Sequence, residues 1–407
     1  MTGISLDRLR SAIEALARFG GLPGGGVTRP AWSPPHEEAR AWLIARMTDA
    51  GLTTRVDPAG NVFGRLGDAS PAVYTGSHID TVPEGGILDG ALGVLAGLEC
   101  LQTIREAKAT HRLPLVLAAW SDEEGRYASL FGSRAFIGRL DPGRAADFAA
   151  VDGERLADAM ARAGFDAGRA HTAAVDPKTV AAYVELHIEQ GPRLEAKRIP
   201  IGIVTAIVGI RRDRITFHGQ ADHSGTTPMA RRRDAFLGAA EYALRARDLV
   251  VRRGSRASVT NVGAVRVHPG VTNIVPARAE LVHEMREPDP KVLERLQRDC
   301  RALAERVAGR RRLSVDIAPM SQTTPVPCAP RVQAAIARAC RDLGLPYRRL
   351  HSAAGHDAQN LALITDSGML FIPSQGGRSH RVDEMSDWDA IERGANVLLR
   401  TLLALAA

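Results

Sequence analysis

Residues 74–99 read YTGSHIDTVPEGGILDGALGVLAGLE. The apolar residues at the start predict a strand that delivers His78 at its carboxyl end, where open α/β sheets bind their ligands. Asp80 and Asp89 follow on short glycine-rich turns. Imidazole and carboxylate groups together are the ligand set of divalent zinc, manganese, cobalt or nickel. From Ala91 onward, small and apolar residues predict a helix that packs tightly against the sheet, so the stretch predicts an α/β fold with a metal site.

The bulk composition limits the class of protein. With 407 residues the chain is long for one core and suggests two domains, and 45% hydrophobic with 24% charged residues is typical of soluble proteins. The net charge is +7, but only 4% of residues are aromatic and no stacking motif appears, so we expect no nucleic-acid partner. The positive charge favours anionic substrates.

The expected compartment is the cytoplasm. The four cysteines show no C-x-x-C spacing and are typical of reduced thiols. The first twenty residues predict an amphipathic helix with charges at Asp7, Arg8 and Arg10, unlike a signal peptide. No apolar run is long enough to span a bilayer, so no membrane partner is expected.

Two further strand ends carry polar side chains. The apolar run 113–120 predicts a buried parallel strand, and Glu123 and Glu124 follow it. Adjacent carboxylates beside a buried strand are costly unless a positive group lies next to them, and a metal with a catalytic base explains the pair. His187 ends another predicted strand, 181–187. The same domain is expected to contain strands 53–56, 61–65, 72–77, 347–350 and 369–372, and helices 5–18, 36–50, 331–343 and 387–405.

The middle of the chain has a different pattern. Strands 214–218, 258–267, 279–285 and 314–318 alternate with helices 231–252 and 289–308, in the β-α-β-β-α-β order of a ferredoxin-like sandwich. We therefore expect residues 209–326 to form an inserted α+β domain. Residues 1–208 and 327–407 are expected to form an α/β catalytic domain, a mixed sheet with helices on both faces.

Five metal-ligand candidates follow predicted strands of one sheet or lie at its edge: His78, Asp89, Glu124, His187 and His380. Five ligands cannot complete two separate sites. If Asp89 bridges, His78 and His187 complete one set of three, and Glu124 and His380 complete the other. Three protein ligands leave an open position for water, as catalytic sites require. The sequence therefore predicts two divalent ions: zinc, or manganese, cobalt or nickel.

Seven motifs carry a family resemblance: GSHIDTV (76–82), DGALGVLAG (89–97), DEEG (122–125), LHIEQGP (186–192), ADHSGTTPM (221–229), AAGHDAQN (353–360) and FIPSQGGRSH (371–380). With them the chain resembles the M20 metallopeptidase-like amidohydrolases. Within these it resembles the branch of N-carbamoyl-amino-acid hydrolases, β-ureidopropionases and allantoate amidohydrolases. His187 favours that branch, because the peptidase side of the family has a carboxylate at this position.

The resemblance implies roles for individual residues. It implies that Glu123 is the general base and that Asp80 orients His78. It also implies an oxyanion-stabilising role for His223, and substrate contacts by Gln190, Asn273, Arg286 and Gly377, with Asn273 and Arg286 on a substrate carboxylate. Finally, it implies a two-fold homodimer formed through the inserted domain. For His356 and Asp357, a hydrogen-bonding pair at a helix start and direct catalysis stay equally open.

These features predict a binuclear metal-dependent hydrolase of linear ureido or amide C–N bonds. Its expected substrate is an N-carbamoyl-L-amino acid, which would give the amino acid, CO2 and ammonia. Allantoate hydrolysis needs the same groups and is an alternative. A second alternative is N-acyl-amino-acid or dipeptide hydrolysis, against which His187 argues. A non-catalytic ligand-binding relative would be expected to have lost a metal ligand or the base, and none is missing.

Overall fold

The computed structural model describes residues 3–407, which form two compact units. Unit 1 comprises the described residues up to Thr205 together with Pro327–Leu350 and His356–Ala407. Unit 2 comprises Ala206–Val326 and the short segment His351–Gly355.

A nine-stranded mixed sheet forms the centre of unit 1, in the order β1-β2-β4-β3-β5-β13-β6-β11, with β12 paired to β6. The central strands β4, β3, β5 and β13 run parallel, so their carboxyl ends meet at one edge. The strands are β1 (Thr53–Val56), β2 (Val62–Leu66), β3 (Ala72–His78), β4 (Leu115–Trp120), β5 (Val180–Ile188), β6 (Ile201–Ile207), β11 (Val326–Pro327), β12 (Tyr347–Ser352) and β13 (Ser367–Ile372).

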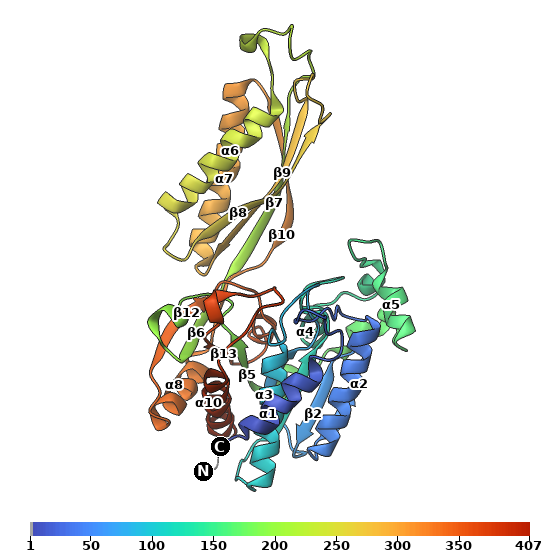
Figure 1. The fold of residues 1–407 in the computed structure, drawn as a ribbon, viewed down its shortest axis with the longest axis vertical. Coiled ribbons are helices and arrows are strands. Elements are labelled where there is room, and N and C mark those ends of the chain that lie inside the picture. The colour runs from blue at the N-terminus through green and yellow to red at the C-terminus, as the bar shows by residue number, and fades with distance from the viewer. Residues whose placement is uncertain (1–2) are drawn as a thin grey trace. The chain divides into compact units, whose positions relative to one another are not determined.

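Helices cover both faces of this sheet, which confirms the predicted fold class. One core packs α1 (Leu6–Leu16), α2 (Pro34–Asp49), α3 (Ala91–Glu106), α8 (Pro330–Asp342) and α10 (Trp388–Ala406) against one face. The other face carries α4 (Phe131–Phe136), α5 (Leu156–Arg162) and α9 (Ala358–Leu361). There, Phe136 packs on Trp120 with 5.0 Å between ring centroids. Figure 1 shows α1, α3 and α10 side by side, as their contacts require.

Gly90 connects the sheet to the helix that follows the first ligands. It precedes α3 with φ +64°, and a Cβ at this position would overlap the imidazole of His78. A side chain there would therefore be strained by its backbone conformation and would displace the ring. Glycine at this position therefore allows the start of α3 to lie against the His78 ring.

Unit 2 has the predicted β-α-β-β-α-β order, and its antiparallel sheet runs β10-β7-β9-β8. Both helices cover one face of the sheet (Figure 1), where the unit's apolar core lies. The residues of β9 alternate between this core and the open face, as expected for a strand covered on one side. The elements are β7 (Gly209–His218), α6 (Ala235–Arg253), β8 (Val259–His268), β9 (Arg278–Glu287), α7 (Pro290–Arg311) and β10 (Ser314–Gln322).

Several element boundaries differ from the predictions. Helix α6 begins at Ala235 rather than Arg231, because the Asp234 side chain accepts a hydrogen bond from Leu237 N at 3.1 Å and caps the helix there. Strand β6 and helix α4 were not predicted. Within residues 3–407, no helix is both long and apolar enough to cross a bilayer.

Candidate metal centre

Asp89 lies at the middle of the candidate centre, and its two oxygens face different imidazoles. Oδ1 lies 3.2 Å from Nε2 of His187 and 3.9 Å from Nε2 of His78. Oδ2 lies 3.3 Å from Nε2 of His380, which in turn lies 3.6 Å from Oε2 of Glu124. The two oxygens of this carboxylate thus face different sets of side chains.

The structure thus brings all five predicted ligand residues together at the carboxyl edge of the parallel strands. His78, Asp89 and His187 offer ligand atoms within 4.8 Å of one another, and so do Asp89, Glu124 and His380. Two other groups of residues meet the same criterion, Glu185 with His187 and His356, and His78 with Glu123 and Glu124. The donor set fits a divalent transition metal, since it combines imidazoles with carboxylates.

Backbone hydrogen bonds orient two of the histidines so that Nε2 of each ring faces Asp89. Nδ1 of His78 donates to the backbone oxygen of Asp80 at 3.0 Å, and Nδ1 of His187 donates to that of Ile188 at 3.0 Å. In the neutral form of each ring, with its proton on Nδ1, Nε2 faces Asp89 and could bind a metal ion. Backbone acceptors commonly fix the tautomer of metal-binding histidines in this way.

Asp80 joins the histidine strand to the acidic loop after β4. Its carboxylate accepts a hydrogen bond from Glu124 N at 3.1 Å and one from Glu123 N at 3.4 Å. This interaction fixes the backbone of the two glutamates. The Glu123 carboxylate then lies 3.5 Å from Nε2 of His78.

The ionisation of the centre reflects crowding of charged groups. Burial raises the pKa of Glu123 well above its usual range, and the neighbouring Glu124 carboxylate raises it further. Burial also raises the pKa of Glu124 to about 8. Although burial opposes it, the Asp89 carboxylate raises the pKa of His187 to about 9. Bound cations would offset the repulsion between the negative charges of these carboxylates.

Gln190 and Gly377 also lie at this edge. Nε2 of Gln190 donates to Asp89 Oδ2 at 2.9 Å and to Ser379 Oγ at 3.1 Å. Gly377 has φ +65°, and a Cβ there would lie 2.7 Å from Pro192 N, so only glycine fits between these segments.

Sequence reasoning did not find Glu384, whose side chain holds the backbone of Asp89. Its side chain accepts hydrogen bonds from Asp89 N at 3.0 Å and from Ser379 Oγ at 2.7 Å. In the sequence, Glu384 is marked only by its position four residues after His380. At that spacing a turn of the chain brings the two residues together.

A second acidic pair, Glu185 and Asp357, is buried beside His187. Glu185 accepts hydrogen bonds from Ser77 Oγ at 2.7 Å and from Ala358 N at 3.1 Å. Asp357 is fully buried and immediately precedes α9, and neither of its carboxylate oxygens has a hydrogen-bond partner among residues 3–407. Burial raises the pKa of Asp357 well above its usual range. Its position before the helix agrees with a helix-start residue, although its side chain does not cap the helix.

Three of the predicted substrate-binding residues lie in unit 2. Nδ1 of His223 accepts hydrogen bonds from Gly225 N at 3.0 Å and Thr226 N at 3.2 Å, which leaves the ring proton on Nε2 as a donor. Asn273 is adjacent, because its backbone oxygen accepts from Ser224 N at 3.0 Å.

Arg286 is already engaged on the open face of the unit 2 sheet. Its Nε donates to Glu284 Oε1 at 2.7 Å and its Nη1 to Ala353 O at 2.9 Å, while Arg212 pairs with the other oxygen of Glu284. Two arginines around one glutamate leave one net positive charge. Sequence reasoning did not find the part that Glu284 takes in this cluster.

Comparisons with known proteins cover nearly the whole chain. The family model for peptidase family M20/M25/M40 matches residues 74–404. An N-carbamoyl-L-amino acid amidohydrolase of Geobacillus stearothermophilus is 39% identical over 405 residues, covering 98% of each chain. An allantoate amidohydrolase of Escherichia coli is 34% identical over 414 residues, covering 98% of this chain and 99% of its own. A crystal structure of a hydantoinase/carbamoylase family amidase from Burkholderia multivorans superposes with a TM-score of 0.90 at 35% identity, covering 99% of this chain and 98% of the other.

Proposed function

The chain belongs to peptidase family M20/M25/M40, and from this we propose that it hydrolyses N-carbamoyl-L-amino acids to the amino acid, CO2 and ammonia. The observation that carries the proposal is the Asp89 carboxylate, shared between His78 and His187 on one side and His380 on the other. The relatives named amidohydrolases, at 34–39% identity over almost the whole chain, support a reaction at a non-peptide C–N bond.

Two divalent ions would be held by the five candidate ligands. His78, Asp89 and His187 would hold one, and Asp89, Glu124 and His380 the other. When bound, the ions would polarise the ureido carbonyl and lower the pKa of the attacking water. Zinc fits this donor set, as do manganese, cobalt and nickel.

Glu123 would act as the proton carrier. Its carboxylate would accept a proton from the attacking water and return it to the leaving nitrogen as the C–N bond breaks. Asp80 would keep Glu123 in place through its backbone, and its own backbone oxygen would keep the His78 ring oriented. Overall, one ureido acid and one water give one amino acid, one CO2 and one ammonia.

Five further residues would position the substrate. His223 would donate its Nε2 proton to the developing oxyanion, and Arg286 with Asn273 would bind the substrate carboxylate. In unit 1, Gln190 and Gly377 would contact the ureido group.

We further propose that the protein is a homodimer formed through unit 2. On α6, Leu237, Leu244 and Val251 are 41%, 69% and 69% exposed and are spaced seven residues apart. This spacing places them on one side of the helix, as in a helix–helix interface. The predicted cytoplasmic location stays a prediction.

The proposal is tested by turnover of a small substrate panel before and after metal removal. We expect N-carbamoyl-L-amino acids to be cleaved faster than allantoate, N-acyl-amino acids or dipeptides. Chelation should abolish turnover, and manganese, cobalt, nickel or zinc should restore it. Faster cleavage of allantoate would favour the activity of the Escherichia coli relative, and active protein free of divalent metal would overturn the metal-dependent reaction.

A further inference from the structure

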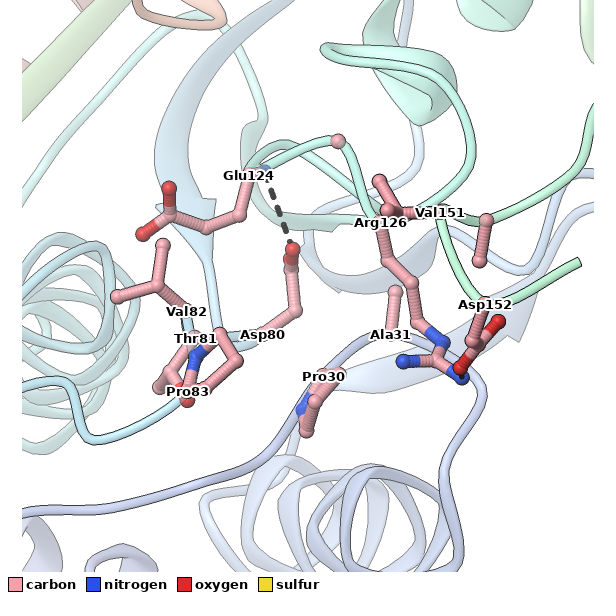
Figure 2. A pocket seen from close by; sticks show the side chains of 12 residues that line it. Pro30, Ala31, Asp80, Thr81, Val82, Pro83, Glu124, Arg126, Val151 and Asp152 are labelled. Carbon is pink, nitrogen blue, oxygen red and sulfur yellow. Dashed lines mark hydrogen bonds and ion pairs between the residues drawn. The ribbon is translucent and has the colours of Figure 1, made fainter. Parts of the chain in front are cut away.

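A cavity of about 410 Å³ adjoins the metal centre within unit 1. It shares Asp80 and Glu124 with that centre. In Figure 2, Asp80 stands between Val82 and Pro83 on one side and Arg126 and Val151 on the other, and a dashed line marks its hydrogen bond with Glu124. The volume lies towards the lower end of the range for small-ligand pockets.

The walls of the cavity are largely apolar. The loop before α2, the turn after His78 and the loop before α5 each contribute two apolar side chains: Pro30, Ala31, Val82, Pro83, Ala150 and Val151. Because these segments are far apart in the sequence, only the fold creates this surface. Apolar walls gain free energy when they cover an apolar ligand group.

The polar side chains of the cavity already have partners in the protein. Asp80 accepts hydrogen bonds from the backbone of the two glutamates, and Thr81 Oγ1 accepts one from Arg29 N at 2.8 Å. Arg126 pairs with Asp152 at 3.2 Å and with Glu154 at 2.7 Å. A polar ligand group would therefore have to displace an existing partner.

The same ion pairs hold the outer wall in place. Arg126 follows the acidic loop of the metal centre by two residues, and its partners Asp152 and Glu154 belong to the loop that contributes Val151. Tyr127 also donates to Glu154 at 2.7 Å. The wall is thus fixed to the segment that carries Glu123 and Glu124. Three carboxylates (Asp80, Glu124 and Asp152) and one arginine line the cavity, which makes it unfavourable for a negatively charged side chain.

We propose that this cavity binds the side chain of the substrate amino acid and selects for uncharged, apolar side chains. The inference rests on the proposed function: with the ureido group at Glu123 and the metal ligands, a group on the α-carbon can extend past Glu124 into the cavity. The cavity thereby distinguishes apolar ureido acids from allantoate, which has a second polar ureido group in place of an apolar side chain.

The test is a ladder of N-carbamoyl derivatives of glycine, L-alanine, L-norvaline and L-norleucine, with the L-aspartate and L-lysine derivatives added. In the wild type, kcat/KM should rise by up to about fourfold per added methylene, the factor expected for burying one CH2. Val82→Asp should flatten this rise, and Val151→Asp, on a fully exposed loop position, should reduce it. The slope of the ladder is the readout, so a general loss of rate does not affect the result.

Val56→Asp is the matched control, because Val56 is an exposed valine on the edge strand β1, away from the cavity lining. It should keep the wild-type slope. A flat wild-type ladder, equal slopes in Val82→Asp and Val56→Asp, or a preference for lysine over norleucine would each overturn the proposal.

A binding experiment tests the cavity independently of the proposed reaction. The binding of free norleucine and of glycine is measured by calorimetry. Tighter binding of norleucine in the wild type but not in Val82→Asp would support the cavity even if no ureido acid were cleaved, and equal binding would overturn it.

Discussion

Glu123 and Glu124 are neighbours in the chain, but their carboxylates meet different partners. Glu123 lies 3.5 Å from Nε2 of His78, whereas Glu124 lies 3.6 Å from Nε2 of His380. The Asp80 carboxylate accepts hydrogen bonds from both backbone nitrogens and so holds the two residues in place. The pair therefore offers a sharp test of which carboxylate carries the proton and which holds metal.

Glu123→Gln should lower kcat by about 10²–10⁴-fold while metal content is kept, because a general base is lost but no ligand. Glu124→Gln should instead weaken the binding of the ion that Glu124 and His380 would share. Elemental analysis beside steady-state kinetics distinguishes the two variants. If both kept the same metal content and the same activity, the assignment would be wrong.

Arg286→Ala should raise KM for substrates with a carboxylate, because the guanidinium would no longer pair with it. The loss of a partly buried charge pair is about 2 kcal/mol, or roughly thirtyfold in KM. The matched control is the corresponding substrate amide, which lacks the carboxylate and should show no such rise. Glu284→Gln should shift KM in the opposite direction, since it removes the anion that now pairs with Arg286. An equal rise for acid and amide would argue against carboxylate binding.

At the scale of elements, residues at strand ends could be predicted from the sequence better than residues that reach the site through loops. His78 is the last residue of β3, His187 is the second-last of β5 and Glu124 follows β4, so parallel pairing of these buried strands brings them together without knowledge of the loops. Glu384 could not be predicted in the same way, because it reaches Asp89 N through a loop fold. Strand β6 was not predicted, because its apolar residues lie where the chain passes from one unit to the other. Its pairing partner β13 is also far away in the sequence.

Gly90→Ala tests the junction between β3 and α3. The added methyl is expected both to strain a backbone at φ +64° and to displace the His78 ring, so we expect weaker metal retention and a lower free energy of unfolding. Gly164→Ala is the matched control, because Gly164 has φ +83° but open space where an added methyl would lie. Thermal unfolding and metal content are the measurements. Equal effects in both variants would mean that only backbone strain matters.

At the scale of the whole molecule, the apolar side of α6 is the feature to test. Leu244→Asp should convert the proposed dimer to a monomer, because it places a charge at the centre of the Leu237–Leu244–Val251 surface. Leu363→Asp is the matched control, since Leu363 is 54% exposed in unit 1. Sedimentation velocity measures the outcome. A wild-type monomer, or an unchanged Leu244→Asp dimer, would contradict this interface.

Mixing two inactive variants tests whether His223 acts on the partner's metal centre. With equal amounts of Glu123→Gln and His223→Ala and free subunit exchange, half of the dimers are mixed, and each mixed dimer has one intact shared site. Recovery should therefore approach about a quarter of wild-type activity. If mixed dimers form but stay inactive, His223 serves the site of its own subunit.

The position of β13 has a consequence for the order in which the chain folds during synthesis. The strands of unit 2 come from one continuous stretch, residues 209–322, so its sheet can form while the ribosome is still translating the part of unit 1 that begins at Pro327. The larger sheet has to wait, because β13 lies between β5 and β6 and is synthesised more than 150 residues after both. His380 follows later still. A nascent chain therefore exposes the edges of β5 and β6 until its final strand is synthesised, and the five candidate ligands cannot all meet before His380 has been added.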